Sequence, residues 1–199
     1  MKSSFQVLPL HGLESGTSYF RPKQELPRRV TANDSALSVM TDLNQVTAVT
    51  IERSAPLMKG LELMVKRGVR ILLVCDSDER LLGLVTSRDL DGEKANRILA
   101  KAGGTQDDLL ISDVMTIRPK LEVMLMADVL QARVGDIVAT LRQVNRQHAL
   151  VLDHELETDK LAVRGIFSLS QIGLRLGLDI NPAHQPTTYA ELAKAGAAL

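Results

Sequence analysis

Apolar residues in the first half of the chain follow strand and helix patterns in turn. A short β-branched stretch at 48–51 precedes a segment with apolar positions at helical spacing. An unbroken apolar run at 71–75 and a second one at 81–85 have strand length, with a polar turn between them. The pattern therefore predicts strand, helix, strand and strand, followed by a helix that opens at Thr86.

The second half of the chain shows the same order. Residues 134–144 have helical spacing, and two strand-like stretches at 149–152 and 161–167 flank a charged turn. A closing helix is expected over 168–176, ended by Gly177.

Three short matches in register indicate that one unit is written twice. Ser38-Val39-Met40-Thr41 returns as Asp113-Val114-Met115-Thr116, and residues 68–76 align with residues 145–153. Gly83-Leu84-Val85-Thr86 returns as Gly165-Ile166-Phe167-Ser168. The chain is therefore predicted to contain two βαββα repeats.

The repeats set the expected boundaries. We predict an N-terminal arm at 1–35, a first repeat at 36–100, a second repeat with its connector at 101–178, and a tail helix within 179–199. The connector is placed in the polar stretch 91–108, which holds two adjacent glycines.

Composition narrows the function classes. Apolar residues make up 45% of the 199 residues, and 24 basic residues balance 24 acidic ones, so no net charge draws the chain to nucleic acid or to a membrane. With a single cysteine, Cys75 in an apolar run, an internal disulfide and a multi-cysteine metal site are excluded. Neither a signal-type apolar region nor a membrane-length apolar stretch is found, so a cytoplasmic location is expected.

The repeated motifs resemble those of the cystathionine-β-synthase (CBS) domain family. That family has a Met-Thr segment leading into a helix, two strands and a Gly-x-x-Thr/Ser-x-x-Asp/Asn motif. Gly83 to Asp89 fits this motif at every defined position. Gly165 to Gln171 fits it up to the last position, where Gln171 replaces the carboxylate or amide. The resemblance covers about residues 36–178.

The resemblance implies an α/β (α+β) fold in which the two repeats pack with pseudo-two-fold symmetry. It implies two clefts between the repeats that hold adenosine-containing ligands such as AMP, ADP, ATP or S-adenosylmethionine, and a homodimer. Many family members regulate an enzyme or a transporter. The expected function is therefore a nucleotide sensor that signals to an unidentified partner, without enzymatic activity. The alternative is a structural dimerisation module with no nucleotide.

Chemistry alone also points to the first motif. A strand that ends with Gly83 to Val85 and turns into a helix at Thr86 directs free backbone N–H groups and a hydroxyl to one spot. Asp89 adds a two-oxygen acceptor on the same face, which suits the adjacent hydroxyls of a ribose. The alternative is a capping box, in which Thr86 and Asp89 satisfy only the helix start.

The second motif keeps the hydroxyl at Ser168 but offers a neutral amide at Gln171. An amide gives up the charge-assisted hydrogen bond that a carboxylate makes. We therefore expect one competent site, built on Thr86 and Asp89, and a weak or empty second one.

Further ligand contacts follow from the resemblance. The family often places basic residues before the second strand, where they face phosphates, and Arg70 and His148 occupy these positions. An exposed arginine after a helix and a satisfied histidine at a strand start are the alternatives. Val49 and Ile51 are the expected apolar contacts of the base.

Other chemistries lack support in the sequence. The four histidines are scattered, so no metal site is predicted, and no nucleophile with a base, P-loop or dinucleotide motif occurs. The methionines at 40, 115, 124 and 126 are expected to fill the core.

Overall fold

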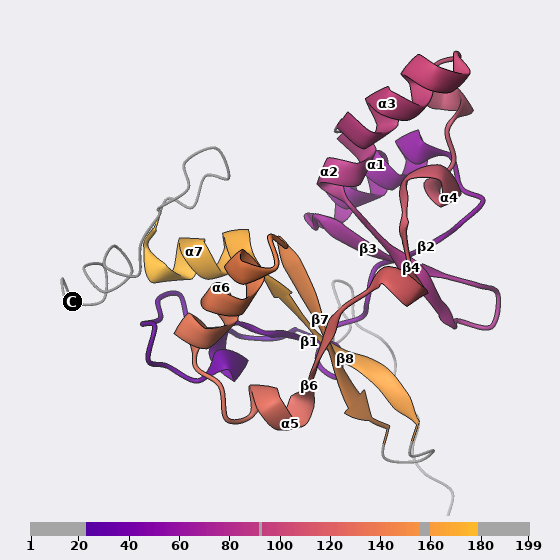
Figure 1. Ribbon diagram of the computed structural model, residues 1–199. Helices are drawn as coiled ribbons and strands as arrows, with labels where there is room; N and C mark the ends of the chain where they lie inside the picture. Colours follow the sequence, from indigo (N-terminus) through magenta and orange to yellow (C-terminus); the bar gives the residue numbers. More distant parts are fainter. Residues whose placement is uncertain (1–22, 92, 156–159, 179–199) are drawn as a thin grey trace, which may run out of the picture.

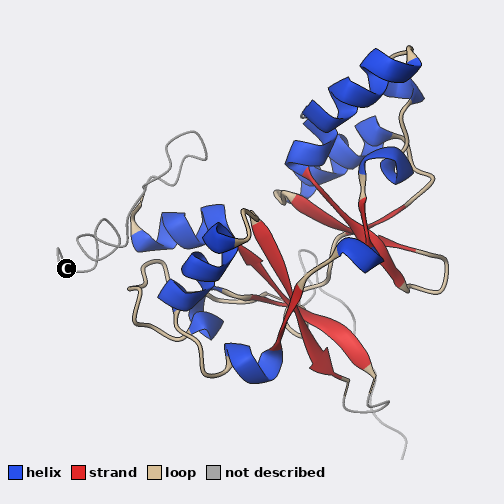
Figure 2. Cartoon of the chain, viewed as in Figure 1, coloured by secondary structure: helices blue, strands red, loops and turns tan. Residues whose placement is uncertain are grey.

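The computed structural model describes residues 23–91, 93–155 and 160–178, which form two lobes (Figure 1). Each lobe has a four-stranded sheet with helices on its outer face (Figure 2). The fold is a mixed α+β fold, as predicted.

The first lobe has the sheet order β2-β3-β4-β5. Its strands are β2 (Thr50–Glu52), β3 (Ile71–Cys75), β4 (Leu81–Thr86) and β5 (Thr116–Ile117). Its helices are α1 (Leu57–Arg67), α2 (Ser87–Asp91), α3 (Glu93–Ala102), η2 (Gln106–Asp108) and α4 (Ile111–Val114). β2 is parallel to β3, while β4 is antiparallel to both β3 and β5.

The second lobe has the sheet order β1-β8-β7-β6. Its strands are β1 (Thr41–Asp42), β6 (Val123–Leu125), β7 (His148–His154) and β8 (Leu161–Ser168). Its helices are η1 (Ala36–Val39), α5 (Met126–Val129), α6 (Val134–Gln143) and α7 (Leu169–Leu176), and η3 (Arg118–Lys120) links the lobes. The pairing repeats that of the first lobe, since β6 is parallel to β7 and β8 is antiparallel to β7 and β1.

The segment that leads into each repeat packs in the opposite lobe. We call residues 36–42 and 111–117 the lead-in segments. The first forms η1 and β1 and pairs with β8, whereas the second forms α4 and β5 and pairs with β4. The two repeats are therefore interlocked, and their packing crosses the domain boundaries predicted from the sequence. These boundaries stay a prediction.

The residues just before each lead-in segment accept hydrogen bonds from backbone N–H groups at the start of a helix in the lobe where that segment packs. The Leu57 N–H donates to the Leu109 carbonyl at 2.8 Å, and the Val134 N–H donates to the Asp34 carbonyl at 2.9 Å. These bonds pair backbone donors that a helix start leaves open. The exchange of segments thus fixes α1 and α6 in equivalent ways.

Between the lobes, the inner faces of the two sheets share an apolar layer. Its buried members are Ile71, Leu73 and Leu150, and Leu84 and Ile166 pack against them. One larger core lies on the helical side of each sheet. The lobes are joined by this layer as well as by the exchanged segments.

Part of the N-terminal arm is described, and it packs on the second lobe. The Gln24 side chain donates to the Met40 carbonyl and accepts from the Asp42 N–H, both at 2.9 Å. The Val30 N–H donates to the Arg175 carbonyl at 3.0 Å, and Val30 is buried in the core of that lobe.

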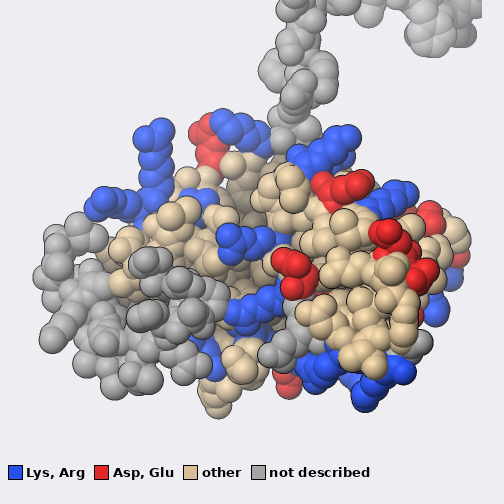
Figure 3. All heavy atoms as spheres, turned by 90° about the horizontal axis from the view of Figure 1, so that it is seen from above, with Lys and Arg blue, Asp and Glu red and all other residues tan. Residues whose placement is uncertain are grey.

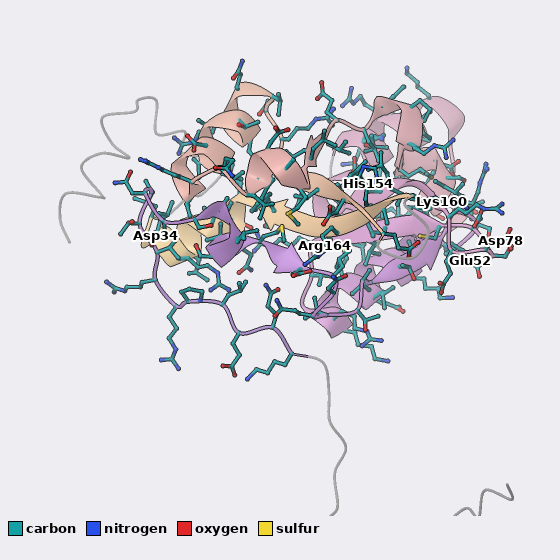
Figure 4. The ribbon with its side chains drawn as sticks, turned by 90° about the horizontal axis from the view of Figure 1, so that it is seen from below. Asp34, Glu52, Asp78, His154, Lys160 and Arg164 are labelled. Carbon is teal, nitrogen blue, oxygen red and sulfur yellow. The ribbon has the colours of Figure 1, made fainter. Side chains whose placement is uncertain are left out.

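An ion-pair cluster fixes β1 to the second sheet. Arg164 donates to both carboxylate oxygens of buried Asp42, at 2.7 and 3.0 Å, and to Asp153 at 3.3 Å. Arg164 lies in the middle of the face seen in Figure 4. The pKa of Asp42 is below its usual value because Arg164 donates to its carboxylate, although burial acts in the opposite direction.

Most predicted elements are confirmed within a few residues, but one helix was not predicted. Residues 93–102, within the stretch assigned to the connector, form helix α3. Ala95 is buried, and Ile98 and Leu99 pack against the core of the first lobe, so a helix with a narrow apolar face was read as polar. The predicted methionine packing is confirmed, since Met40 and Met126 are buried and Met115 and Met124 pack against the cores. The predicted tail helix lies outside the described residues.

Candidate functional site

Four strand ends of the two lobes meet at one edge of the shared layer. β3 starts beside the end of β4, where Ile71 pairs with Thr86, and β7 starts beside the end of β8, where His148 pairs with Ser168. The charges of Arg70, Arg88 and Asp89 in the first lobe act on His148 in the second. We call Arg70, Thr86, Arg88, Asp89, His148 and Ser168 the strand-end site.

Backbone hydrogen bonds tie each helix start to the strand beside it. The Ser87 N–H donates to the Arg70 carbonyl at 3.0 Å, and the Leu169 N–H donates to the Gln147 carbonyl at 2.9 Å. Arg70 and Arg88 are exposed. Lys and Arg side chains gather along the middle of the face seen in Figure 3, where the lobes meet. The site is therefore open to solvent and carries positive charge.

Thr86 and Asp89 form the predicted capping arrangement. Asp89 Oδ2 accepts from the Thr86 N–H at 2.9 Å and from the Thr86 hydroxyl at 2.7 Å. The Asp89 side chain is 19% exposed, and its other oxygen, Oδ1, lies 3.7 Å from Lys94 Nζ. Because each carboxylate oxygen has two acceptor positions, capping by Oδ2 leaves Oδ1 able to accept from a ligand hydroxyl. The capping and ribose roles are thus compatible.

Lys94 is a neighbour of the site that sequence reasoning missed. It lies on α3, beyond the motif, and its ammonium group also donates to the carbonyls of Val114 and Met115. These carbonyls end α4, where a cation is favourable. Arg88 was missed too, although it stands inside the motif beside Asp89. Arg88 could have been identified from the motif that contains it. Lys94 could not, because it lies on helix α3, which the sequence did not predict.

His148 has an unusual environment. Its ring is partly buried, and its Nδ1 atom is fully buried without a hydrogen-bond partner among the described residues. The pKa of His148 is lowered to about 4, first by burial and then by the positive charges of Arg70 and Arg88, while Asp89 acts in the opposite direction. The ring is therefore neutral at pH 7 and lacks the positive charge with which a protonated histidine would contact a phosphate.

The second motif is built differently. Ser168 makes no capping bond, and its hydroxyl lies 3.1 Å from the Ser170 hydroxyl. Gln171 is exposed on α7. Ser168 thus has no carboxylate from its own motif, whereas Thr86 has Asp89. Whether either half binds a ligand stays a prediction.

Gly83 has a structural reason to be glycine. A Cβ atom there would lie 2.2 Å from the Thr116 carbonyl oxygen and 2.6 Å from Met115 Cε. Gly165 has the equivalent place, where a Cβ atom would lie 2.4 Å from Met40 Sδ. The motif glycines thus admit the Met-Thr lead-in segments, and this packing accounts for Gly83 without a ligand contact.

Val49 and Ile51 lie away from the strand-end site. Thr50 pairs with Leu73 and Ile51 with Val74, so β2 lies level with the far half of β3. Ile51 is 7% exposed and belongs to the core under α1. This placement gives no support to these residues as contacts of a base, and that role stays a prediction.

A cleft of about 1790 Å³ opens at the opposite edge of the shared layer. Its apolar residues include Leu73, Leu81 and Val163, and charged side chains such as Glu52 and Lys160 line it as well. Both of these charged residues are labelled in Figure 4. The charges are of both signs, and the cleft does not include the residues of the strand-end site.

Within the described ranges, no three His, Cys, Asp or Glu side chains group as metal ligands would. No helix in the part of the chain that the structure describes is long and apolar enough to cross a membrane.

Together, the interlocked βαββα repeats and the strand-end site define a paired-repeat α+β module. Residues 37–94 match the family model of the CBS domain. The match lies in the first repeat, and the second repeat has the same order of elements.

Solved structures of similar fold include two at a TM-score of 0.50. An uncharacterized conserved protein from Pyrococcus horikoshii is 19% identical, and the match covers 72% of this chain and 92% of that chain. The CBS-domain containing protein ATU1752 from Agrobacterium tumefaciens is 16% identical, with coverage of 78% and 96%. These likenesses show the fold.

A third structure is the CBS domain pair of protein MJ0100 in complex with 5′-methylthioadenosine and S-adenosyl-L-methionine. It is 17% identical, with a TM-score of 0.49 and coverage of 73% and 97%. No curated protein matched the sequence of this chain.

Proposed function

We propose that this protein is a regulatory module that binds an adenosine-containing nucleotide at the strand-end site and signals its occupancy to a partner protein. The observation that carries the proposal is the meeting of Thr86 and Asp89 with Arg70, Arg88 and His148 across the two lobes. A hydroxyl, a carboxylate and two cations from the first repeat, together with a neutral imidazole from the second, then surround one place.

The chemistry of the site matches the parts of a nucleotide. Asp89 Oδ1 is available to a ribose hydroxyl, because Lys94 is too far away for a short hydrogen bond at 3.7 Å. Arg70 and Arg88 are exposed cations that suit a phosphate, with guanidinium groups able to donate in a bidentate way. The site therefore favours a ligand with a sugar diol and an anionic group, such as AMP, ADP or ATP.

A mechanism for signalling follows from the interlocked fold. A ligand between the lobes can act only by binding one arrangement of the lobes better than another. The strand-end site contacts both repeats, and Lys94 links Asp89 to the end of α4 in the second lead-in segment. Binding would thus change the balance between arrangements that a partner protein or a second copy in a homodimer can distinguish. The cytoplasm is the proposed location, and regulation without catalysis the proposed role.

A thermal-shift screen tests the proposal. AMP, ADP, ATP, S-adenosylmethionine, 5′-methylthioadenosine and NAD are each added to the full chain. A nucleotide at a hundredfold excess over its dissociation constant stabilises the fold by about 2.7 kcal/mol, which raises Tm by several degrees. If no compound in the panel shifts Tm, a structural dimerisation module without a nucleotide becomes the better account.

A further inference from the structure

We propose that binding of an anionic group at Arg70 and Arg88 is coupled to the uptake of one proton by His148. The module would then respond to ligand and pH together. This inference rests on the proposed function and adds a regulatory property to the same site.

The geometry places His148 where a bound anion must act on it. His148 starts β7, and the first lobe directs the charges of Arg70, Arg88 and Asp89 onto it. Its partner across the sheet, Ser168, is uncharged. On its own side, the exposed Arg146 lies 3.8 Å from the Glu122 carboxylate, so these two charges oppose each other. The net charge that faces the ring is therefore positive in the unliganded protein.

The buried Nδ1 atom supplies a second, independent observation. A buried polar atom without a partner is unfavourable, and most such atoms in folded proteins have one. Nδ1 of His148 has none among the described residues. A ligand at the strand-end site, directly or through a water, would give the ring such a partner.

The direction of the coupling follows from the charges. In the free protein, burial and the two arginines favour the neutral ring, with a pKa of about 4. A phosphate between Arg70 and Arg88 offsets their positive charge and places an acceptor near the ring, and both effects raise the pKa. Because the bound form then binds a proton that the free form lacks, affinity rises as pH falls from above the bound pKa toward 4.

Calorimetric titration with AMP tests this coupling. Titrations are run at pH 5.5 and pH 8 in pairs of buffers with different ionisation enthalpies, which gives the number of protons taken up. AMP is expected to bind about tenfold more tightly at pH 5.5 than at pH 8 in wild type relative to His148→Asn, with uptake of up to one proton. This follows if the bound ring regains its ordinary pKa of 6.5, because it is then mostly protonated at pH 5.5, whereas the free ring with a pKa of about 4 is mostly neutral. The comparison with this variant removes the titration of the AMP phosphate itself.

Two controls isolate the residue and the anion. His154→Asn changes a histidine at the other end of the same strand, and it should keep the wild-type pH dependence. Adenosine lacks the phosphate, so its affinity should not vary with pH in wild type or in His148→Asn. If His148→Asn does not fold, the imidazole pKa of wild type measured by NMR should rise from about 4 toward 6.5, by about two units, on saturation with AMP.

The outcomes separate the two proposals. AMP binding with equal pH dependence in wild type and His148→Asn, or with an unchanged imidazole pKa, overturns the proton coupling and leaves nucleotide binding intact. A failure of AMP and adenosine to bind at either pH counts against the proposed nucleotide site, and against the coupling with it.

Discussion

At the scale of single residues, the two motif glycines show how a short sequence pattern serves packing. Gly83 and Gly165 lie under the lead-in segments of the partner repeats. Added atoms at such close contacts force the neighbours apart. The neighbours differ, because backbone faces Gly83, whereas a flexible methionine side chain faces Gly165.

We therefore expect Gly83→Ala to destabilise the protein by about 1–3 kcal/mol, and more than Gly165→Ala does. Urea unfolding of both variants measures the difference in free energy. Met40→Ala should recover part of the loss in Gly165→Ala, because it removes the clashing side chain. Equal losses of unfolding free energy in the two variants, with no recovery on Met40→Ala, would show that these close contacts do not determine the destabilisation.

Asp42 gives a prediction about pH. Its pKa is lowered because Arg164 donates to it, so the ion pair stabilises the fold above the ordinary pKa near 3.8 and this contribution is lost as pH falls through the folded value. Asp42→Asn should cost about 2 kcal/mol at pH 7, since the pair is largely buried but Arg164 is partly exposed.

The same variant should lose less stability than wild type between pH 5 and pH 3, as measured by chemical denaturation. Asp78→Asn, which removes a carboxylate that pairs with Arg80 in an exposed position, is the matched control and should behave as wild type does. Parallel pH profiles for wild type and Asp42→Asn would exclude Asp42 as a source of the acid sensitivity.

At the scale of elements, the sequence predicted the long strands well but missed the short strands β1, β5 and β6. The apolar runs at 71–75 and 81–85 match β3 and β4 because buried strands leave a continuous signal. Helix α3 was missed because its apolar face is narrow and two glycines follow it. Thr86, Asp89, Arg70 and His148 were found from repeat and motif, whereas Lys94 reaches the site from that missed helix.

The site could not be completed from one sequence for a physical reason. The pairing of β2 with β3 sets Thr50 and Ile51 level with Leu73 and Val74, while the strand-end site lies at the opposite end of β3. Periodicity identifies the strands but gives no register between them. The neutral state of His148 likewise depends on Arg70 and Arg88, which reach it from the other lobe.

At the scale of the whole molecule, the exchanged lead-in segments make each lobe depend on residues from the other repeat. Val39 in η1 is 4% exposed within the core of the second lobe. Val114 in α4 is fully buried within the core of the first. A defect in one repeat should therefore be felt in the other lobe.

Val39→Ala should thus loosen the second lobe, and Val114→Ala the first, each by about 2 kcal/mol. Native-state hydrogen exchange measures this effect, because it reports the opening of each part separately. Amides in β7 and β8 should exchange faster in Val39→Ala, and those in β3 and β4 in Val114→Ala. If exchange became faster only in the first lobe of Val39→Ala, or only in the second lobe of Val114→Ala, the interlocked packing would be contradicted.

The central claim is that Asp89 does more than cap a helix, and the chain offers a matched control. Asp108 caps Thr105 with the same two bonds that Asp89 makes to Thr86, at 2.8 Å to the N–H and 3.0 Å to the hydroxyl. Asp108 is exposed and is not part of the strand-end site. The two carboxylates therefore differ in their surroundings but share their capping chemistry.

The decisive measurement is the dissociation constant of the best-binding nucleotide for wild type, Asp89→Ala and Asp108→Ala. Asp89→Asn serves as a second variant, since its amide oxygen can still accept from the Thr86 N–H. Loss of a hydrogen bond to a charged group should weaken binding to Asp89→Ala at least about tenfold, while Asp108→Ala binds as wild type does. Equal affinity in all of these proteins would show that Asp89 only caps its helix, and would contradict the account.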